Sequence, residues 1–210
     1  MSFLEKLTNY QLDTLKEIGN LGAGRAASAL SQIVNKRISM EVPSVRISSF
    51  EEAADIIGGP DKVIVAVYLR VEGEAPGSMF YLLTPEQAVR FVQHINGNKK
   101  LSAENPVFSD MEWSLLQELG NILSGAYLTS LSDFTNLHMS QTVPSVSVDM
   151  AGAILPQGLL ELSKESDHAI IVDTIIQEEG LDNEHIQGHF FFLPDPSSFE
   201  KIFEALGIQE

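Results

Sequence analysis

The sequence predicts an α+β fold in which two tandem α-β-β-β-α units are related by a pseudo-two-fold axis. The first observation is a motif of a small polar residue, a glutamate and an asparagine that recurs 101 positions later in the chain. It reads Asp13-x-x-x-Glu17-x-x-Asn20 in the first half and Ser114-x-x-x-Glu118-x-x-Asn121 in the second. The second observation is that 22 residues separate each motif from a proline, Pro43 or Pro144, which lies in the segment Val-Pro-Ser-Val both times. The third is that both halves show the same order of expected helices and strands, which indicates a duplicated unit.

A unit of three strands and two helices is small for independent stability. We therefore expect the strands of both halves to join in one continuous sheet with the helices packed over it. At 210 residues, the chain is long enough to bury a substantial core. The prediction is a single domain over residues 1–210, with internal repeats at about 9–98 and 109–207.

The first element is predicted to be one long helix from about Asn9 to Asn35. Its apolar residues fall within a stripe about 120° wide when they are projected at about 100° per residue. The stripe consists of Leu12, Leu15, Ile18, Ala26, Ala29, Leu30 and Ile33. Asp13, Glu17 and Asn20 lie on a narrow sector roughly opposite, because positions i, i+4 and i+7 share a helical face. The motif thus occupies a face that the core does not use.

Three glycines interrupt this helix. Gly19 and Gly22 point to its apolar side, where the lack of a side chain lets another backbone come close. Gly24 lies beside Asn20 on the polar face and leaves room for a partner. The spacing Gly19-x-x-Gly22-x-Gly24 faintly resembles a nucleotide-binding loop. The order of glycines is wrong for such a loop and no strand precedes it, so we set this interpretation aside.

The rest of the first half is predicted as strands followed by a helix. The expected strands are Ser44–Phe50, Lys62–Val71 and Gly77–Leu83, with a short helix at Glu51–Ile57. Thr84 and Pro85 are typical of a helix start, as N-cap and first helical residue. This helix is expected to run to about Ile95.

The second half repeats this order with one insertion. Its predicted elements are a helix at Ser109–Asp133, strands at Ser145–Ala151, Ala169–Gln177 and Gly188–Leu193, and a helix at Ser197–Leu206. The apolar stripe of its long helix is Leu116, Leu119, Leu123, Tyr127, Leu131 and Phe134. Ile154–Ser166 is the insertion, and it carries a short apolar stretch of its own.

Composition excludes several classes of function. The net charge of −16 argues against nucleic acid and anionic membranes as partners, since both would be repelled. The absence of cysteine excludes disulfides, Cys-ligated metals and Cys nucleophiles. No apolar run approaches the roughly 20 residues that span a bilayer, and the first residues lack the apolar core of a secretory signal. These features predict a soluble cytoplasmic protein.

A glutamate and an asparagine on an exposed helical face are most simply part of a solvated surface. Comparison of the two copies instead favours a functional role for the glutamate and the asparagine. Neighbouring surface residues differ between the copies, as Arg25 does from Ala126, whereas the glutamate and the asparagine are kept. The first motif position changes from Asp13 to Ser114, so it requires only a small polar group.

The pair has a limited chemistry, because no nucleophile, general base or metal cluster accompanies it. A carboxamide is a weak acid and a weak base, so an asparagine acts by orienting a substrate or water through its donor and acceptor. A glutamate can hold a cation or position a lysine of a partner. Such a pair suits phosphoryl-group hydrolysis, in which the catalyst mainly positions water while a metal and a lysine neutralise charge.

The pattern Asp/Ser-x3-Glu-x2-Asn-x22-Pro, present twice, resembles the signature of the CheC-type chemotaxis phosphatases. This family also includes CheX and the flagellar-switch proteins FliY and FliM. The resemblance covers nearly the whole chain, and the two motifs, tandem halves and length suit its CheC members. CheX-like proteins would be shorter with one motif, FliY would carry an additional C-terminal domain, and FliM-like middle domains lack the paired motifs.

The resemblance implies hydrolysis of the aspartyl phosphate on a CheY-type response regulator. Asn20 and Asn121 would orient the attacking water, and Glu17 and Glu118 would pair with a lysine of the regulator. The resemblance also implies that magnesium is bound by the regulator, so that this chain has no cofactor of its own. It further implies the receptor deamidase CheD as a second partner.

Two alternatives stay open at this point. One is a binding module of the same fold, an adaptor or switch-type protein that docks the phosphorylated regulator without catalysis. The other is a hydrolase with its own metal ion. His185 and His189 have a spacing that suits a metal site on a helix, but the sequence around them reads as a strand, which favours a structural role.

Overall fold

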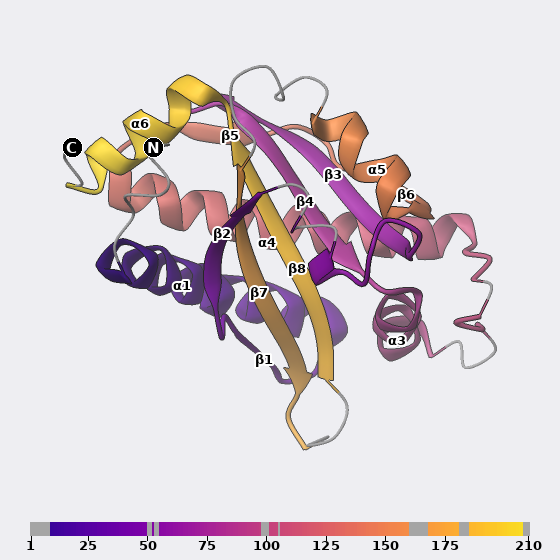
Figure 1. Cartoon of the computed structure of the whole chain (residues 1–210). Coiled ribbons are helices and arrows are strands. Elements are labelled where there is room, and N and C mark those ends of the chain that lie inside the picture. Colours follow the sequence, from indigo (N-terminus) through magenta and orange to yellow (C-terminus); the bar gives the residue numbers. More distant parts are fainter. Residues whose placement is uncertain are drawn as a thin grey trace.

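The structure, a computed structural model, describes residues 9–49, 52, 55–97, 101–104, 106–159, 168–180 and 185–207. Its elements are α1 (Asn9–Val34), β1 (Ile38–Glu41), β2 (Val45–Ser49), β3 (Val63–Gly73), β4 (Gly77–Leu83), α3 (Pro85–Asn96), α4 (Asp110–Thr135), β5 (Met139–Gln141), β6 (Ser145–Met150), α5 (Ala151–Leu159), β7 (His168–Glu178), β8 (His185–Pro194) and α6 (Pro196–Ala205). Figure 1 shows the strands gathered into one sheet with helices against it.

All eight strands belong to one continuous sheet, in which every pairing is antiparallel. Its order is β1-β7-β8-β4-β3-β5, with β2 also paired to β7 and β6 also paired to β3. The first half therefore contributes β1 and β2 to a strand of the second half, and the second half contributes β5 and β6 to a strand of the first. β4 and β8 pair at the centre. The predicted continuous sheet is confirmed, and its two halves exchange their outer strands.

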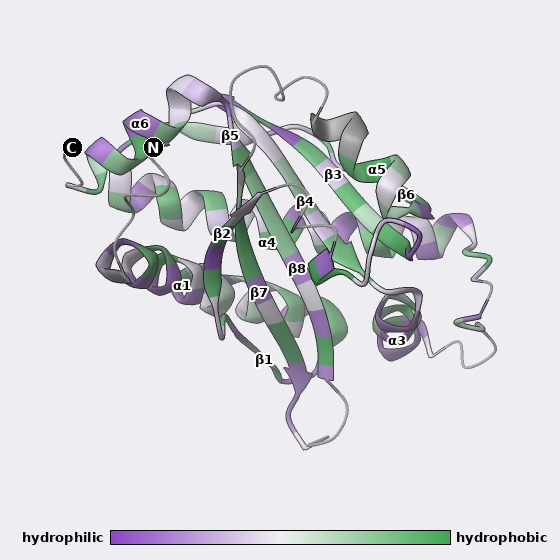
Figure 2. Ribbon diagram, in the orientation of Figure 1, coloured by the Kyte–Doolittle hydropathy of each residue, from purple (hydrophilic) through white to green (hydrophobic). Residues whose placement is uncertain are grey.

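Successive side chains of a strand point to opposite faces of the sheet, so neighbouring residues of one strand pack into two different cores. On β3, Val65 and Val67 belong to the core beneath α1, α3, α4 and α6, whereas Ile64 and Ala66 belong to a smaller core that includes α5. In Figure 1, α5 accordingly lies on the opposite side of the sheet from α1 and α4. Because both faces are covered over much of their length, β3, β7 and β8 are mostly apolar, as Figure 2 shows.

The ends of the helices follow local rules of capping. Thr84 caps α3 as predicted, since its side chain accepts a hydrogen bond from the Gln87 N–H and Pro85 follows it. Ser109 and Glu112 form a capping box at the start of α4. Asn35 and Asn136, at matching positions after α1 and α4, both have positive φ, of 51° and 55°. A left-handed residue of this kind commonly ends a helix.

The predicted order of elements is confirmed, with a short strand added in each half. β1 and β5 follow the long helices directly, and with four and three residues they are too short to show a period in the sequence. The predicted insertion contains part of α5, which begins at Ala151. The short helix expected at Glu51–Ile57 lies partly outside the described residues.

The predicted apolar stripes are wrong at their last positions. Ile33 and Phe134 are 51% and 45% exposed, whereas Leu15, Ile18 and Leu116 are fully buried. Ile33 and Phe134 lie in the last turns of α1 and α4. Periodicity assigns a residue to a helical face, but it does not show where the surface that packs against that face ends.

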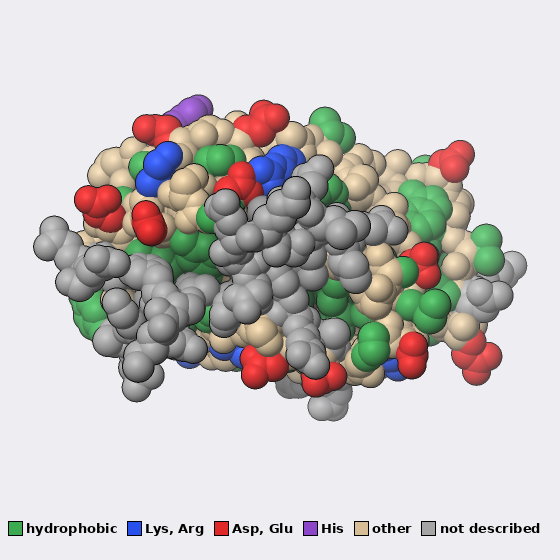
Figure 3. Space-filling model, turned by 45° about the horizontal axis from the view of Figure 1, so that its top comes forward, with side chains coloured by type: hydrophobic (Ala, Val, Ile, Leu, Met, Phe, Trp, Pro, Cys, Tyr) green, Lys and Arg blue, Asp and Glu red, His purple; other side chains and the backbone are tan. Residues whose placement is uncertain are grey.

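Acidic side chains on the face of the molecule shown in Figure 3 do not form a single block. On the face shown in Figure 3, Asp and Glu side chains lie at separate places, with fewer Lys and Arg side chains between them. The acidic side chains visible on that face are thus spread out, and the net charge of the whole chain is −16. Distributed charge of one sign favours solubility.

Glycines let the two long helices approach their neighbours closely. A Cβ on Gly22 would lie 3.1 Å from the Cα of Tyr127, so α1 and α4 meet there backbone to backbone. A Cβ on Gly120 would lie 2.3 Å from the Cγ1 of Val67 on β3. The prediction that glycines on the apolar side admit another backbone is confirmed for Gly22.

We expect Gly120→Ala to destabilise the protein by about 2–3 kcal/mol, because the buried, β-branched Val67 has little freedom to move away. Gly24→Ala is the matched control. A Cβ there meets nothing within 4 Å, so the exposed helix should gain up to about 1 kcal/mol from the better helix propensity of alanine. Denaturant unfolding of both variants measures the difference, and equal midpoints would show that the α4–β3 contact is loosely packed.

Candidate functional site

The two copies of the motif lie on outward faces of the two long helices. On α1, the side chains of Asp13, Glu17 and Asn20 are all exposed. On α4, Ser114 and Glu118 are exposed and Asn121 is partly buried. Each motif faces a connection between two strands, β1–β2 for the first copy and β5–β6 for the second. These connections carry Pro43 and Pro144.

In the first copy, the carboxamide of Asn20 is held by main-chain groups. The Val42 N–H donates a hydrogen bond of 3.0 Å to Asn20 Oδ1. Asn20 Nδ2 donates to the Lys16 carbonyl at 3.1 Å and lies 3.5 Å from the Val42 carbonyl. The asparagine therefore links α1 to the β1–β2 connection, and both ends of its amide are engaged.

In the second copy, a side chain takes over this link. Gln141 Nε2 donates to Asn121 Oδ1 at 2.6 Å and to the Asn121 carbonyl at 3.0 Å. Asn121 Nδ2 lies 3.4 Å from Glu118 Oε2, a long hydrogen bond. The glutamate and asparagine of this copy thus lie next to each other, as the predicted i, i+3 relation requires.

The second copy lines an open groove with a cavity volume of about 370 Å³. Its walls are formed by Ser114, Gln117, Glu118 and Asn121 of α4 and by Gln141, Thr142, Val143 and Pro144 of the facing segment. Four predicted site residues, Ser114, Glu118, Asn121 and Pro144, therefore meet in one place. The Gln117 side chain donates to the Pro144 carbonyl at 2.5 Å and ties the two walls together.

The two Val-Pro segments differ in which residue faces the core. Val42 is 3% exposed and packs where a Cβ on Gly19 would touch it at 3.4 Å, whereas its counterpart Val143 is 82% exposed. The prolines show the reverse, since Pro43 is exposed and Pro144 is buried. The second groove therefore has an apolar side chain on its rim.

Sequence reasoning missed four residues of this groove, Gln117, Gln141, Thr142 and Val143. Nothing in the repeated segment Val-Pro-Ser-Val separates Val143 from the buried Val42. Gln141 offered a signal, because its counterpart in the first copy is Met40. A polar residue that replaces an apolar one close to a repeated motif is a reason to look for a contact with that motif.

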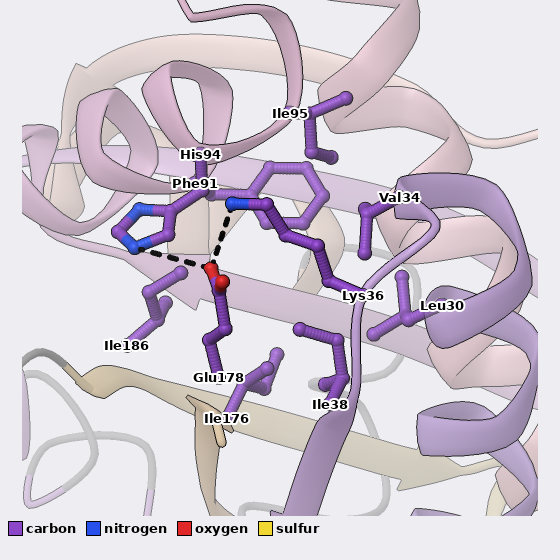
Figure 4. A pocket seen from close by; sticks show the side chains of 10 residues that line it. All are labelled: Leu30, Val34, Lys36, Ile38, Phe91, His94, Ile95, Ile176, Glu178 and Ile186. Carbon is purple, nitrogen blue, oxygen red and sulfur yellow. Dashed lines mark hydrogen bonds and ion pairs between the residues drawn. The ribbon is translucent and has the colours of Figure 1, made fainter. Parts of the chain in front are cut away.

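A separate pocket lies away from both motifs. It is lined by Leu30, Val34, Lys36, Ile38, Phe91, His94, Ile95, Ile176, Glu178 and Ile186, which Figure 4 shows. Most of its lining is apolar. Lys36 Nζ and Glu178 Oε2 form an ion pair of 2.9 Å beside it, and His94 Nε2 lies 4.0 Å from the same oxygen. No residue of either motif lines this pocket, so we interpret it as an incompletely filled end of the core.

The histidines that have metal-like spacing belong to a strand, as predicted. His189 lies on β8 opposite Asp173 on β7, and His189 Nδ1 and Asp173 Oδ1 are 2.8 Å apart. Burial opposes the charge of Asp173, but hydrogen bonds from His189 and Ser44 together with Arg46 outweigh it and hold the pKa of this carboxyl below its usual value. This is a structural network on the sheet.

The described residues contain no group of three or more His, Asp or Glu side chains arranged to hold a metal ion. None of their helices is both long enough and apolar enough to cross a membrane.

Comparison with known proteins gives the family. The model of the CheC-like family matches residues 11–47 and 111–148, the two segments that contain the motifs. A protein of Bacillus subtilis named CheY-P phosphatase CheC is 45% identical over 207 residues, which cover 99% of both chains. The chain belongs to the CheC-like family. A more distant relative of Halobacterium salinarum, named putative CheY-P phosphatase CheC1, is 23% identical over 93% of this chain and 96% of its own.

Solved structures support the same fold. The crystal structure of Thermotoga maritima FliY matches this member of the CheC-like family with a TM-score of 0.75, over 97% of this chain and all of the other. The crystal structure of the FliG–FliM complex from H. pylori matches with a TM-score of 0.66, over 94% of this chain and all of the other. Their sequence identities of 20% and 16% show the fold alone. The predicted CheC-like α+β fold is confirmed.

Proposed function

We propose that this protein is a phosphatase that hydrolyses the aspartyl phosphate of a CheY-type response regulator. The observation that carries the proposal is the 45% identity, over nearly the full length of both chains, to a protein named CheY-P phosphatase. Both motif segments lie within the parts that the family model matches. The activity is that of a hydrolase that acts on a protein-bound phosphoryl group.

We assign the water-orienting role to Asn20 and Asn121 and the docking role to Glu17 and Glu118. Phosphoryl transfer requires mainly a positioned water and neutralised charge, so an amide that fixes the water contributes through orientation. An exposed carboxylate one turn away can pair with a lysine of the regulator. The magnesium ion is held by the regulator in this proposal, and Asp13 and Ser114 make minor contacts.

We propose that both copies are active sites. The geometry supports a difference between them. The groove of the second copy is open, and among the described residues the amide nitrogen of Asn121 has a long hydrogen bond to Glu118 and no other partner. The amide of Asn20 is engaged at its oxygen by Val42 and at its nitrogen by Lys16. The first site therefore has to release or share more contacts when a substrate binds.

The proposal is tested by following the decay of a phosphorylated CheY-type regulator with and without the wild-type chain. The proposal predicts faster decay at catalytic amounts of the chain. The alternative of a non-catalytic adaptor predicts binding with an unchanged decay rate. A chain that binds the phosphorylated regulator and leaves its lifetime unaltered is therefore an adaptor.

A resident metal ion is tested separately. The chain is treated with a chelator, freed from it, and assayed with magnesium as the only added divalent cation. We expect full phosphatase activity, because in this proposal the magnesium ion binds to the regulator and this chain needs no metal ion of its own. Activity that returns only after a different ion is added to the chain itself would support a metal-dependent hydrolase.

Val143 is expected to contribute to docking, because an apolar side chain that is 82% exposed at the rim of the groove can be buried by a partner. In a chain that carries Asn20→Ala, so that only the second site acts, Val143→Ser should raise KM about fivefold, equivalent to about 1 kcal/mol, and leave kcat unchanged. Val63→Ser, at a partly exposed valine outside the groove, is the control. An unchanged KM for Val143→Ser would show that Val143 does not contribute to docking.

Binding to a receptor deamidase of the CheD type and a cytoplasmic location stay predictions. The first rests on the resemblance and the second on composition. Co-purification of the two proteins and a measured dissociation constant test the first of them.

A further inference from the structure

The carboxamide oxygen of the motif asparagine accepts a hydrogen bond in both copies, but from different donors. In the first copy the donor is the main-chain N–H of Val42, at 3.0 Å from Asn20 Oδ1. In the second copy it is the side-chain amide of Gln141, at 2.6 Å from Asn121 Oδ1. The side chain of Val143, the counterpart of Val42, is exposed, and in this copy a side chain supplies the contact that the Val42 main chain provides in the first.

The orientation of both amides in the second copy follows from the main chain. A carbonyl oxygen can only accept a hydrogen bond, so the Gln141 atom 3.0 Å from the Asn121 carbonyl is the nitrogen. The same nitrogen lies 2.6 Å from the side chain of Asn121, so the asparagine atom that faces it is the oxygen. Asn121 Nδ2 is therefore turned toward Glu118 and the groove.

Packing alone does not account for a glutamine at this position. Gln141 Oε1 is buried and accepts no hydrogen bond from any described residue, and a buried acceptor of this kind is costly. Met40, the counterpart in the first copy, carries no such cost. A Cβ on Gly125 would lie 3.4 Å from Gln141 Nε2, whereas one on its counterpart Gly24 would meet nothing within 4 Å. The second copy thus accommodates an amide whose nitrogen is bound to Asn121 and whose oxygen lacks a partner among the described residues.

We propose that Gln141 is a positioning residue for Asn121 at the second site. The torsion that turns a carboxamide is broad and nearly two-fold, so without a donor the oxygen and nitrogen of Asn121 can exchange places. With Gln141 bound to its oxygen, Asn121 keeps one orientation, and the second lone pair of that oxygen stays available for a water. This inference rests on the proposed function, because the water-orienting role of Asn121 is part of it.

The test uses Gln141→Met, which introduces the residue of the first copy, in two backgrounds. In Asn20→Ala, where only the second site acts, kcat for the regulator phosphate should fall about fivefold to tenfold and KM should stay within a factor of two. In Asn121→Ala, where only the first site acts, Gln141→Met should change neither value. Ser140→Ala, at the exposed neighbour on β5, is the matched control and should change neither value in either background.

The outcomes of this experiment distinguish failure of the inference from failure of the proposed function. A lower kcat in the Asn20→Ala background alone supports the positioning role, and a thermal midpoint at or above that of the parent excludes loss of folding as its cause. An unchanged kcat in that background overturns the inference and leaves the proposed function intact. An equal fall in both backgrounds overturns it as well, since it indicates a general structural effect. If Asn20→Ala alone has no activity while the wild type is active, the second site is not catalytic, and this part of the proposed function fails together with the inference.

Discussion

A chain that carries both Asn20→Ala and Asn121→Ala is expected to lose its ability to accelerate decay of the regulator phosphate. Each asparagine is assigned to orient the attacking water, and alanine offers neither a donor nor an acceptor. Removal of one well-placed orienting group costs about 2–4 kcal/mol in the barrier, which corresponds to a rate about 30-fold to 10³-fold lower at each site. The rate of dephosphorylation is measured by quenching the reaction at successive times and determining how much phosphorylated regulator remains.

The two single variants should differ in their effect. Asn121→Ala is expected to remove the larger share of the activity, because Asn121 lines an open groove and Asn20 is engaged at both ends of its amide. Gln32→Ala, at an exposed carboxamide elsewhere on α1, is the matched control and should be fully active. Substantial activity in the double variant, with unchanged stability, would falsify the role of both asparagines and would direct attention to the glutamates.

Neither half of the chain is expected to fold when it is produced alone. A fragment of residues 1–105 keeps β1 and β2 but lacks β7, with which both of them pair, and a fragment of residues 106–210 keeps β5 and β6 but lacks β3. The pairing of β4 with β8 would also be lost. Each fragment would expose long apolar strand edges, which favour aggregation over folding.

Circular dichroism and thermal unfolding of the separate fragments check this expectation. When the two fragments are mixed during refolding, they should recover a cooperative transition, because the missing strands are then supplied by the other fragment. A cooperative transition in either fragment alone contradicts it, and shows that a half can form a stable unit without exchanged strands. This experiment also tests our proposal that residues 1–210 form a single domain.

Much of the fold could be predicted from local patterns. The stripe of Leu15, Ile18 and Leu30 on α1 is buried as its period indicates, and the cap at Thr84 forms as its residue type indicates. Such features depend on residues within a few turns of one another. β1 and β5 could not be predicted in this way, because strands of four and three residues have too few positions to display a period.

Part of the candidate site could likewise be predicted from local spacing, and part of it could not. Glu118 and Asn121 were placed together by helical spacing, and the structure brings Ser114 and Pro144 into the same groove. Gln141 was not predicted, because its contact with Asn121 depends on how the segment after α4 returns along the helix. The two residues lie 20 positions apart, and the sequence between them does not specify the path of the chain.

The recurrence of the motif, the outward helical face of each copy and the family to which the motifs point could be predicted without a structure, because all three depend on spacing along the chain. The exchange of strands, the burial of Val42 against the exposure of Val143, and the side-chain donor at Asn121 could not, because they depend on contacts between distant segments. The two identical Val-Pro-Ser-Val segments differ in burial because burial is set by neighbours from distant parts of the chain. The space beside Gly19 is filled by Val42 and by Val172 of β7, whereas the space beside its counterpart Gly120 is filled by Val67 of β3.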